Sequence, residues 1–292
     1  MPASGNGRLA IDDAIAQRIP HPDRLLFPDV NIRRRDVVAY YAEVGPYLIE
    51  WGRGRKLTLK RYPHGIHSRA FYQKHTPSGT PILLYSVADL LDWVGRGALE
   101  FHAPLGLVDA PRDHDWAILD LDPNPPAGWA DVIAVARAVI DLLVLLDVPY
   151  LMKTSGQKGL HFYLPIEPCA EDIVLEIMRA LAELVVEVMP QQATLARLKR
   201  DRGARVYLDY LQNGAERTTV MPYSVRATAT ATVSMPITVQ ELTRAPDTWT
   251  VQTVLQALQD DGPRFHWVGP RIDLIHLARR HRLWKGQTGH GW

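Results

Sequence analysis

Cysteine is nearly absent from this sequence of 292 residues, in which Cys169 is the single example. One cysteine cannot form an intramolecular disulfide, and the eleven histidines show no paired spacing of the kind that zinc sites use, so we expect no structural zinc. Long hydrophobic runs are missing as well. The most apolar stretch, residues 132–148, contains three charged side chains and falls short of the roughly 18 uninterrupted apolar residues of a membrane span. No basic leader followed by an apolar segment opens the chain, which favours a protein of the reducing cytoplasm without a membrane partner.

The net charge is only +1, but basic and acidic residues are unevenly distributed along the chain. Residues 1–79 contain thirteen Lys and Arg against seven Asp and Glu, residues 80–196 contain six against seventeen, and residues 197–292 contain fourteen against eight. Basic flanks therefore bracket an acidic middle. A protein that binds a polyanion and holds metal ions at its centre needs this distribution, because phosphates attract cations and divalent metals attract carboxylates. Uneven surface charge without functional meaning fits the counts equally well.

Helices and short strands alternate along the chain without the regular spacing of a doubly wound or barrel fold, so we predict an α+β fold with mixed or antiparallel sheets. Residues 9–284 are expected to form one domain, between flexible segments at 1–8 and 285–292. Apolar residues at helical spacing predict helices over residues 35–51, 130–147 and 170–188, the first with a break or kink at Pro46. A further helix is expected to begin after a cap formed by Ser86 and Asp89. β-Branched and aromatic runs predict strands over residues 56–62, 116–122, 150–154, 159–165 and 205–210.

Two aspartates stand at the end of the strand predicted over residues 116–122. Because successive strand side chains alternate between faces, Asp120 and Asp122 point the same way, and a divalent cation would relieve their mutual repulsion. An Asp-x-Asp pair by itself is also typical of a solvated strand end. A third carboxylate, Asp209, follows on another predicted strand, with Tyr207 on its face. Three carboxylates on neighbouring strands suit a site for two metal ions, although Asp209 alone fits a surface acid as well.

The segment Ser-Gly-Gln-Lys-Gly-Leu-His at residues 155–161 joins two predicted strands. Glycines on both sides of the Gln-Lys pair let the backbone turn tightly, while Ser155, Lys158 and backbone N–H groups are donors that a phosphate accepts. The segment is not a Walker A loop, because Lys158 is followed by a glycine and a strand in place of Ser or Thr and a helix. It predicts a phosphate-binding loop, with a β-hairpin carrying an incidental lysine as the alternative.

Cations and aromatics are interleaved between residues 60 and 75. Lys60 lies on a predicted strand, and Phe71 and Tyr72 follow among basic side chains. Proteins stack nucleic-acid bases on exposed aromatics and hold the backbone with cations in this way, but taken alone the two aromatics fit a buried core slightly better. His102 on its own is typical of a surface histidine or of one whose hydrogen bonds are satisfied. Neither feature decides the function by itself.

In this order, the motifs resemble the polymerase domain of bacterial ligase D, in the archaeo-eukaryotic primase superfamily. The resemblance covers nearly the whole chain and rests on residues 22–28, 59–63, 71–75, 120–123, 154–161, 209–213 and 222–227. It implies a primase-polymerase fold with an RNA-recognition-like catalytic core flanked by helices. The family's metal carboxylates correspond to Asp120, Asp122 and Asp209. The family's contacts to the incoming nucleotide correspond to Lys60, His102, Ser155, Lys158, Gln212 and Arg226, and less closely to Arg202.

The resemblance also implies an activity and its partners. The expected reaction adds ribo- or deoxynucleotides from nucleoside triphosphates to a primer 3′ end, with a template or terminally, and with Mn²⁺ favoured over Mg²⁺. The expected partner is a DNA end with a recessed primer and a 5′-phosphate, met during non-homologous end joining, which would place the protein at the nucleoid. The family's template-stacking aromatic pair corresponds to Phe71 and Tyr72. Its two 5′-phosphate-binding lysines correspond to Arg24 and Arg34, and arginine can bind a phosphate through two hydrogen bonds.

The chain departs from the family in two further respects. The segment between residues 72 and 98 is shorter than in members that use a long loop there to bring two DNA ends together, so the sequence leaves end bridging open. The length leaves no room for ligase or nuclease domains, and we expect sealing by a separate ligase, with an end-binding protein as a further partner. A metal-dependent nuclease that uses the same carboxylates and a DNA-end-binding protein without catalysis are the alternatives.

Overall fold

The computed structural model describes residues 19–283, and the expected flexible segments 1–8 and 285–292 lie outside them. The strands are β1 (Leu25–Phe27), β2 (Ile32–Arg33), β3 (Thr58–Arg61), β4 (Phe71–Gln73), β5 (Ala98–Ala103), β6 (Asp113–Pro123), β7 (Leu151–Thr154), β8 (Leu160–Ala170), β9 (Ala193–Thr194), β10 (Val206–Asp209), β11 (Thr219–Val220) and β12 (Pro236–Ile237). The α-helices are α2 (Arg34–Gly52), α3 (Val87–Gly95), α4 (Trp129–Leu145), α5 (Glu171–Val188), α6 (Lys199–Arg202), α7 (Val251–Asp261) and α8 (Leu274–Arg280). Short 3-10 helices are η1 (Pro28–Val30), η2 (Tyr210–Asn213), η3 (Val239–Thr243) and η4 (Pro246–Thr248).

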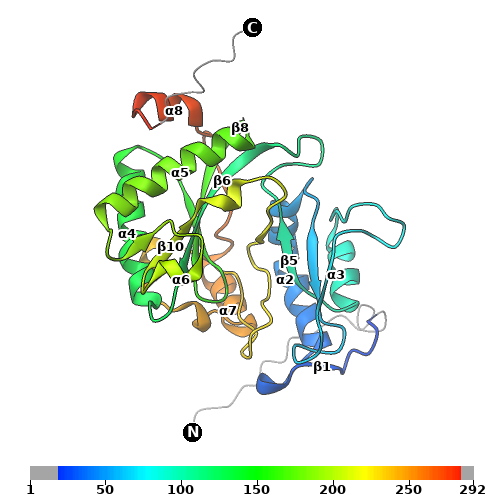
Figure 1. The fold of residues 1–292 in the computed structure, drawn as a ribbon. Helices are drawn as coiled ribbons and strands as arrows, with labels where there is room; N and C mark the ends of the chain where they lie inside the picture. The colour runs from blue at the N-terminus through cyan, green and yellow to red at the C-terminus, as the bar shows by residue number, and fades with distance from the viewer. Residues whose placement is uncertain (1–18, 284–292) are drawn as a thin grey trace.

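Within residues 19–283 the strands form three sheets, of two, four and six strands. The six-stranded sheet has the order β12-β7-β8-β6-β10-β9, and the four-stranded sheet has the order β11-β5-β3-β4. Paired neighbours are antiparallel except β9 and β10, which are parallel. In Figure 1 the larger sheet lies on the left with α4 and α5, and the smaller sheet lies on the right with α2 and α3. This arrangement confirms the predicted α+β class with antiparallel and mixed sheets.

The two faces of β6 serve different purposes. Leu119 faces α4 and α5, where it packs with Phe162 of β8 in the main core. Trp116 and Ile118 face the other way and form a separate apolar cluster with Tyr163, against which Trp51 of α2 also packs. Because strand side chains alternate, the next two residues on this second face are the aspartates at positions 120 and 122. One face of β6 therefore carries apolar side chains in its first half and two aspartates near its end.

Several local predictions need correction. Helix α2 runs from Arg34 to Gly52 without interruption, so the break considered at Pro46 is wrong. Pro46 is exposed, and water can hydrate the carbonyl that it leaves without a donor. Strands β6 and β8 extend past their predicted limits, because a register shift between His114 and Trp116 lets pairing resume beyond Pro165. The helix cap at residue 86 is confirmed on α3.

Some elements gave no sequence signal at all. No predicted strand corresponds to β5, which is buried along both faces and so lacks the alternation of a half-buried strand. None corresponds to the strands of two or three residues either, which are too short to show a period. None of the helices within residues 19–283 is both long and apolar enough to cross a membrane.

One buried side chain extends the pairing of β6 beyond the end of β10. The carboxamide of Asn213, fully buried at the end of η2, accepts a hydrogen bond from the Ile118 N–H at 2.8 Å and donates to the Ile118 carbonyl at 2.7 Å. It also donates to the Tyr210 carbonyl at 2.8 Å. An amide that offers a donor and an acceptor side by side thus replaces a strand residue and fastens η2 to β6, two positions from Asp120.

We expect Asn213→Leu to lower the free energy of unfolding by about 2–3 kcal/mol, because it leaves the backbone N–H and C=O of Ile118 buried without partners. Urea unfolding followed by circular dichroism measures the change. The exposed Gln191→Leu serves as the control and should change the free energy of unfolding by no more than about 0.5 kcal/mol. Equal losses in the two variants would contradict the strand-like role of the amide.

Candidate active site

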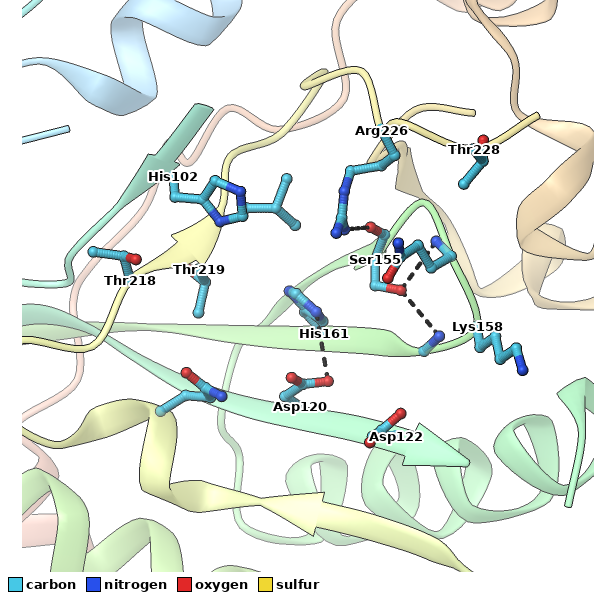
Figure 2. Close-up of a pocket in the computed structure, with 14 residues that line it drawn as sticks. His102, Asp120, Asp122, Ser155, Lys158, His161, Thr218, Thr219, Arg226 and Thr228 are labelled. Carbon is cyan, nitrogen blue, oxygen red and sulfur yellow. Dashed lines mark hydrogen bonds and ion pairs between the residues drawn. The ribbon is translucent and has the colours of Figure 1, made fainter. Parts of the chain in front are cut away.

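A cavity of about 560 Å³ opens between the two larger sheets, within the range of roughly 300–1,000 Å³ typical of small-molecule sites. Its walls come from β5, β6, β8, β11, η2, the β7–β8 loop and the segment after β11. In Figure 2, His102 and Arg226 lie across the cavity from Asp120 and Asp122. The lining residues are His102, Asp120, Asp122, Ser155, Gln157, Lys158, Gly159, His161, Gln212, Thr218, Thr219, Val220, Arg226 and Thr228.

A row of four polar residues crosses the six-stranded sheet at the acidic side of the cavity. In the strand register, Lys153 is opposite His161, His161 is opposite Asp120, and Asp120 is opposite Asp209. Directly opposed residues of an antiparallel pair point to the same face. The sheet therefore brings together side chains that lie as far as 56 positions apart along the chain.

The first two members of this row are buried deeply. Burial lowers the pKa of Lys153 and of His161 well below their usual ranges, and the nearby Arg226 lowers both further. The Lys153 Nζ lies 2.9 Å from His161 Nδ1 and donates to Ser234 Oγ at 2.8 Å. With Lys153 as the donor, the ring proton of His161 is on Nε2, which lies 3.5 Å from Asp120 Oδ1. The histidine is thereby oriented toward the carboxylate.

Asp120 occupies a position that disfavours its negative charge. Burial, reinforced by Asp209 and Asp122, raises the pKa of Asp120 to about 8. Repulsion of this kind is relieved when a divalent cation binds between the carboxylates, and oxygen ligands of this type suit Mg²⁺ and Mn²⁺. The carboxylates at positions 120 and 122 line the cavity and so fit a metal-binding role chemically.

The third expected ligand, Asp209, is beside Asp120 but engaged in other bonds. Its Oδ1 accepts hydrogen bonds from the Tyr207 hydroxyl at 3.1 Å and from the Leu211 N–H at 3.0 Å. Its Oδ2 accepts one from Gln212 Nε2 at 2.9 Å. Across residues 19–283, no three Asp, Glu, His or Cys side chains are arranged as a ready ligand set for one metal ion. The sheet thus places the three aspartates together, and the side chain of the third is turned to local partners.

Arg202, an expected nucleotide contact, is placed against one of these acids. Its side chain is buried and donates from Nη1 to Asp122 Oδ2 at 3.1 Å, while its other nitrogens donate to the carbonyls of Ala196 and Arg197. The guanidinium also lies 3.8 Å from the centroid of the Tyr207 ring. In this arrangement Arg202 holds Asp122 in place.

The hydroxyl of Ser155 organises the β7–β8 loop. Its Oγ accepts hydrogen bonds from the Gln157 N–H at 3.2 Å and from the Gly159 N–H at 3.0 Å. These two backbone donors, which we expected to face a phosphate, are thus bound within the loop. Lys158 is exposed and lines the cavity. The loop therefore places a cation at the cavity, while two of its backbone N–H groups are bonded to Ser155.

Both glycines of this loop are required by space. A Cβ atom on Gly156, whose φ is +70°, would lie 2.6 Å from Arg226 Cγ and 2.8 Å from the Ser234 nitrogen. A Cβ atom on Gly159 would lie 2.5 Å from the carbonyl oxygen of Leu121 on β6. The loop can therefore approach the acidic strand only because these two side chains are absent.

Opposite the acids, one buried carboxylate gathers three of the expected nucleotide contacts. The Glu100 carboxylate on β5 lies 3.2 Å from His102 Nε2, 3.3 Å from Arg226 Nε and 3.8 Å from Lys60 Nζ. Burial by itself raises the pKa of Glu100, but the His102 hydrogen bond and the charges of Arg226 and Lys60 outweigh it and lower that pKa to about 2. Burial lowers the pKa of His102. We call Lys60, His102 and Arg226 the cationic wall, and the Glu100 carboxylate that they surround stays ionised.

The two expected template-stacking aromatics are exposed, so the slight preference for a core position was wrong. Phe71 is 44% exposed and Tyr72 is 64% exposed on β4, an edge strand of the four-stranded sheet. The Lys60 Nζ lies 5.8 Å from the Tyr72 ring centroid, and the Arg61 guanidinium lies 5.0 Å from the Phe71 ring centroid. Exposed rings flanked by cations are suited to stacking against bases.

The expected 5′-phosphate ligands are placed differently from each other. Arg34 is 3% exposed and donates through its two amino groups to the carbonyls of Pro20 and Pro63. Burial, together with Arg24 and Arg61, lowers the pKa of Arg34. This placement corrects the prediction that Arg34 meets a phosphate directly, because its amino groups are engaged with the backbone. Arg24 lies nearer the surface and remains suited to that role.

Sequence reasoning missed three residues of the site as functional candidates: Lys153, His161 and Glu100. Each is a charged or titratable residue inside an otherwise apolar strand, which is the signal that could have marked it. Their partners are set by strand register, as with Lys60 opposite Glu100, and register is not visible in local sequence.

We expect the contribution of Asp120 to the stability of the metal-free chain to fall as pH rises from about 4 toward 8. The folded state retains a proton on Asp120 through this window, while an aspartate in the unfolded chain, whose pKa is about 3.9, has released it. Asp120→Asn removes this titration. The free energy of unfolding of the variant minus that of the native chain should therefore be larger at pH 8 than at pH 5 by roughly 1–4 kcal/mol. Urea unfolding with a chelator at both pH values measures this increase, and the exposed Asp113→Asn on the same strand should show none. A constant difference across pH would contradict the raised pKa.

Comparisons with known proteins agree with the geometry. The family model of the LigD primase-polymerase domain matches residues 33–265. The multifunctional non-homologous end joining protein LigD of Pseudomonas aeruginosa is 30% identical over an alignment of 295 residues including gaps. The alignment covers 92% of this chain and 35% of that protein. The bifunctional non-homologous end joining protein LigD of Bacillus subtilis is 30% identical over 262 residues, which cover 83% of this chain and 42% of that protein. The chain thus spans well under half the length of these relatives.

A solved structure gives the same result for the fold. The polymerase domain from Mycobacterium tuberculosis ligase D in complex with DNA matches with a TM-score of 0.78 at 29% identity, covering 84% of this chain and 94% of that one. The match confirms the predicted primase-polymerase fold. On the family model, the relatives and this structure together, the chain belongs to the LigD primase-polymerase domain family.

Proposed function

We propose that the chain is a nucleotidyltransferase that extends a primer 3′ end with ribo- or deoxynucleotides taken from nucleoside triphosphates. One observation carries the proposal: a single cavity has the acids Asp120 and Asp122 on one side and the cations Lys158 and Arg226 on another. Nucleotidyl transfer needs both, because the triphosphate requires positive charge while the reacting oxygens require divalent cations held by carboxylates. Membership of the LigD primase-polymerase family supports this assignment.

In this proposal the cationic wall holds the incoming nucleotide. Lys60, Lys158 and Arg226 would bind the triphosphate beside the Ser155 loop and align its α-phosphate with the primer hydroxyl. His102 and Gln212 line the same cavity and would contact the rest of the nucleotide. Arg202 would act through Asp122, to which it is bonded.

Asp120 and Asp122 would hold Mn²⁺ or Mg²⁺, with Asp209 beside them as the third carboxylate. When bound, two such ions would lower the pKa of the primer 3′-hydroxyl and stabilise charge on the leaving pyrophosphate. The contact between His161 and Asp120 would orient that carboxylate toward the cavity. With the hydroxyl activated in this way, no side chain is required as a general base.

The DNA substrate we propose is an end with a recessed primer and a 5′-phosphate. The M. tuberculosis domain in complex with DNA and the relatives named for non-homologous end joining support a role in that repair process. That role would place the chain at the nucleoid in the cytoplasm. Phe71 and Tyr72 would stack on the template, and Arg24 would bind the 5′-phosphate. A ligase activity and an end-binding protein would complete the joining.

We expect the native chain with Mn²⁺ and nucleoside triphosphates to lengthen a recessed primer on a 5′-phosphorylated template. Asp120→Ala should slow extension by about 100-fold or more, because a carboxylate proposed to hold the divalent ions is lost. Asp113→Ala, at the exposed start of the same strand, should extend at the native rate. Denaturing gels of labelled primer measure the rates.

The same gels distinguish the alternative functions. Primer shortening would indicate a metal-dependent nuclease, and a mobility shift without a product would indicate an end-binding protein without catalysis. Extension by Asp120→Ala at the native rate would contradict the assignment of the metal carboxylates.

We expect Phe71→Ala or Tyr72→Ala to weaken binding of a primer–template with a single-stranded overhang by about tenfold, since each removes an exposed ring on which a base can stack. Tyr85→Ala provides a matched control, because Tyr85 is 74% exposed and lies outside the cation-flanked strand. Fluorescence anisotropy at fixed salt measures the affinities. Equal weakening by all three variants would contradict the template-binding role.

A further inference from the structure

Glu100 is an anion in the wall that is expected to bind a polyanion. Its side chain is 2% exposed, and the proposed reaction uses neither its charge nor its proton. A carboxylate this close to a triphosphate site would repel the ligand, so its presence requires an explanation other than direct contact. The explanation lies in what surrounds it.

The strand register places the surrounding groups on Glu100. Lys60 of β3 is directly opposite Glu100 of β5, and His102 follows two positions later on the same face. The Glu100 Oε1 accepts a hydrogen bond from the Ala227 N–H at 3.2 Å. The neighbouring Arg226 places its Nε 3.3 Å from Glu100 Oε2. One carboxylate is therefore shared by side chains from two strands and from the segment that follows β11.

Arg226 extends this arrangement to the larger sheet. Its guanidinium, close to Glu100 through Nε, donates from Nη1 to the carbonyl oxygen of Ser155 in the β7–β8 loop. Lysine and arginine side chains have many rotamers in solution, and cations that share a site repel one another. Without a central anion, these side chains would spread away from the cavity.

We propose that Glu100 is a positioning residue for the incoming nucleotide, which holds His102 and Arg226 at the cavity wall, and Lys60 beside them, before the triphosphate arrives. Binding then orders fewer side chains and is stronger for that reason. The inference deepens the proposed function and rests on it for the identity of the ligand. It assigns to Glu100 an effect on nucleotide affinity that acts through these side chains, without contact to the reacting atoms.

The chain offers a matched control for a buried glutamate that pairs with an arginine and a histidine. Glu171, at the start of α5, is 7% exposed and lies 2.9 Å from Arg112 Nε and 3.9 Å from His114 Nε2. Unlike His102 and Arg226 beside Glu100, neither of these partners is among the residues that line the described cavity. Glu171→Gln should therefore reproduce the loss of a buried ion pair without affecting the nucleotide. Any effect common to both variants is one of stability.

The test measures nucleotide binding and extension in parallel. Isothermal titration with a non-hydrolysable UTP analogue and Mn²⁺, without DNA, should show about tenfold weaker binding by Glu100→Gln than by the native chain, and native affinity in Glu171→Gln. In primer extension, Glu100→Gln should raise KM for the nucleotide by about the same factor and leave kcat within about twofold. Glu100→Asp, which keeps the charge, should recover part of the affinity.

The outcomes separate this inference from the proposed function. If the native chain extends primers and Glu100→Gln binds the analogue as tightly as the native chain, the positioning role is overturned and the polymerase function stands. If no chain extends primers but Glu100→Gln alone binds the analogue tenfold more weakly, the positioning role stands and the polymerase function is overturned. Equal weakening in Glu100→Gln and Glu171→Gln, or a native chain that binds no nucleotide, overturns the positioning role.

Discussion

Repulsion between carboxylates on adjacent strands is the constraint around which the rest of this molecule is arranged. Antiparallel pairing of β6 and β10 sets Asp120 directly opposite Asp209, with Asp122 on the same face. The surrounding contacts all bear on this concentration of charge. His161 faces Asp120 on one side, Arg202 is bonded to Asp122 on the other, and burial raises the pKa of Asp120 to about 8. A site built in this way has a strong electrostatic reason to take up cations.

The same property of β6 produces both the core and the site. One face of the strand packs on α4 and α5 through leucines, and the other begins with Trp116 and Ile118 and ends with the two aspartates. A single alternating pattern therefore fixes where the helices dock and where the acids point. The cationic wall follows a similar logic on β5, where Glu100 and His102 share one face.

Local pattern was sufficient for part of this description. Alternation on one strand placed Asp120 and Asp122 together, and helical spacing located α4 and α5 to within a few residues. The contacts of Lys153, His161 and Glu100 could not be predicted, because they depend on which strands pair and in what register. Exposure of Phe71 and Tyr72 follows from the edge position of β4, and burial of Arg34 follows from carbonyls that approach it from two distant turns. These features are set by the tertiary fold.

The bond from Arg226 to the Ser155 carbonyl joins the two larger sheets at the cavity, and its consequence is mechanical. On the face of β6 that carries the two aspartates, Trp51 of α2 packs against Trp116, with ring centroids 4.9 Å apart. A displacement of about 1 Å between reacting groups can slow a reaction by roughly 100-fold. In the proposed reaction, the alignment of the reacting groups would therefore depend on apolar packing remote from the carboxylates as well as on charge.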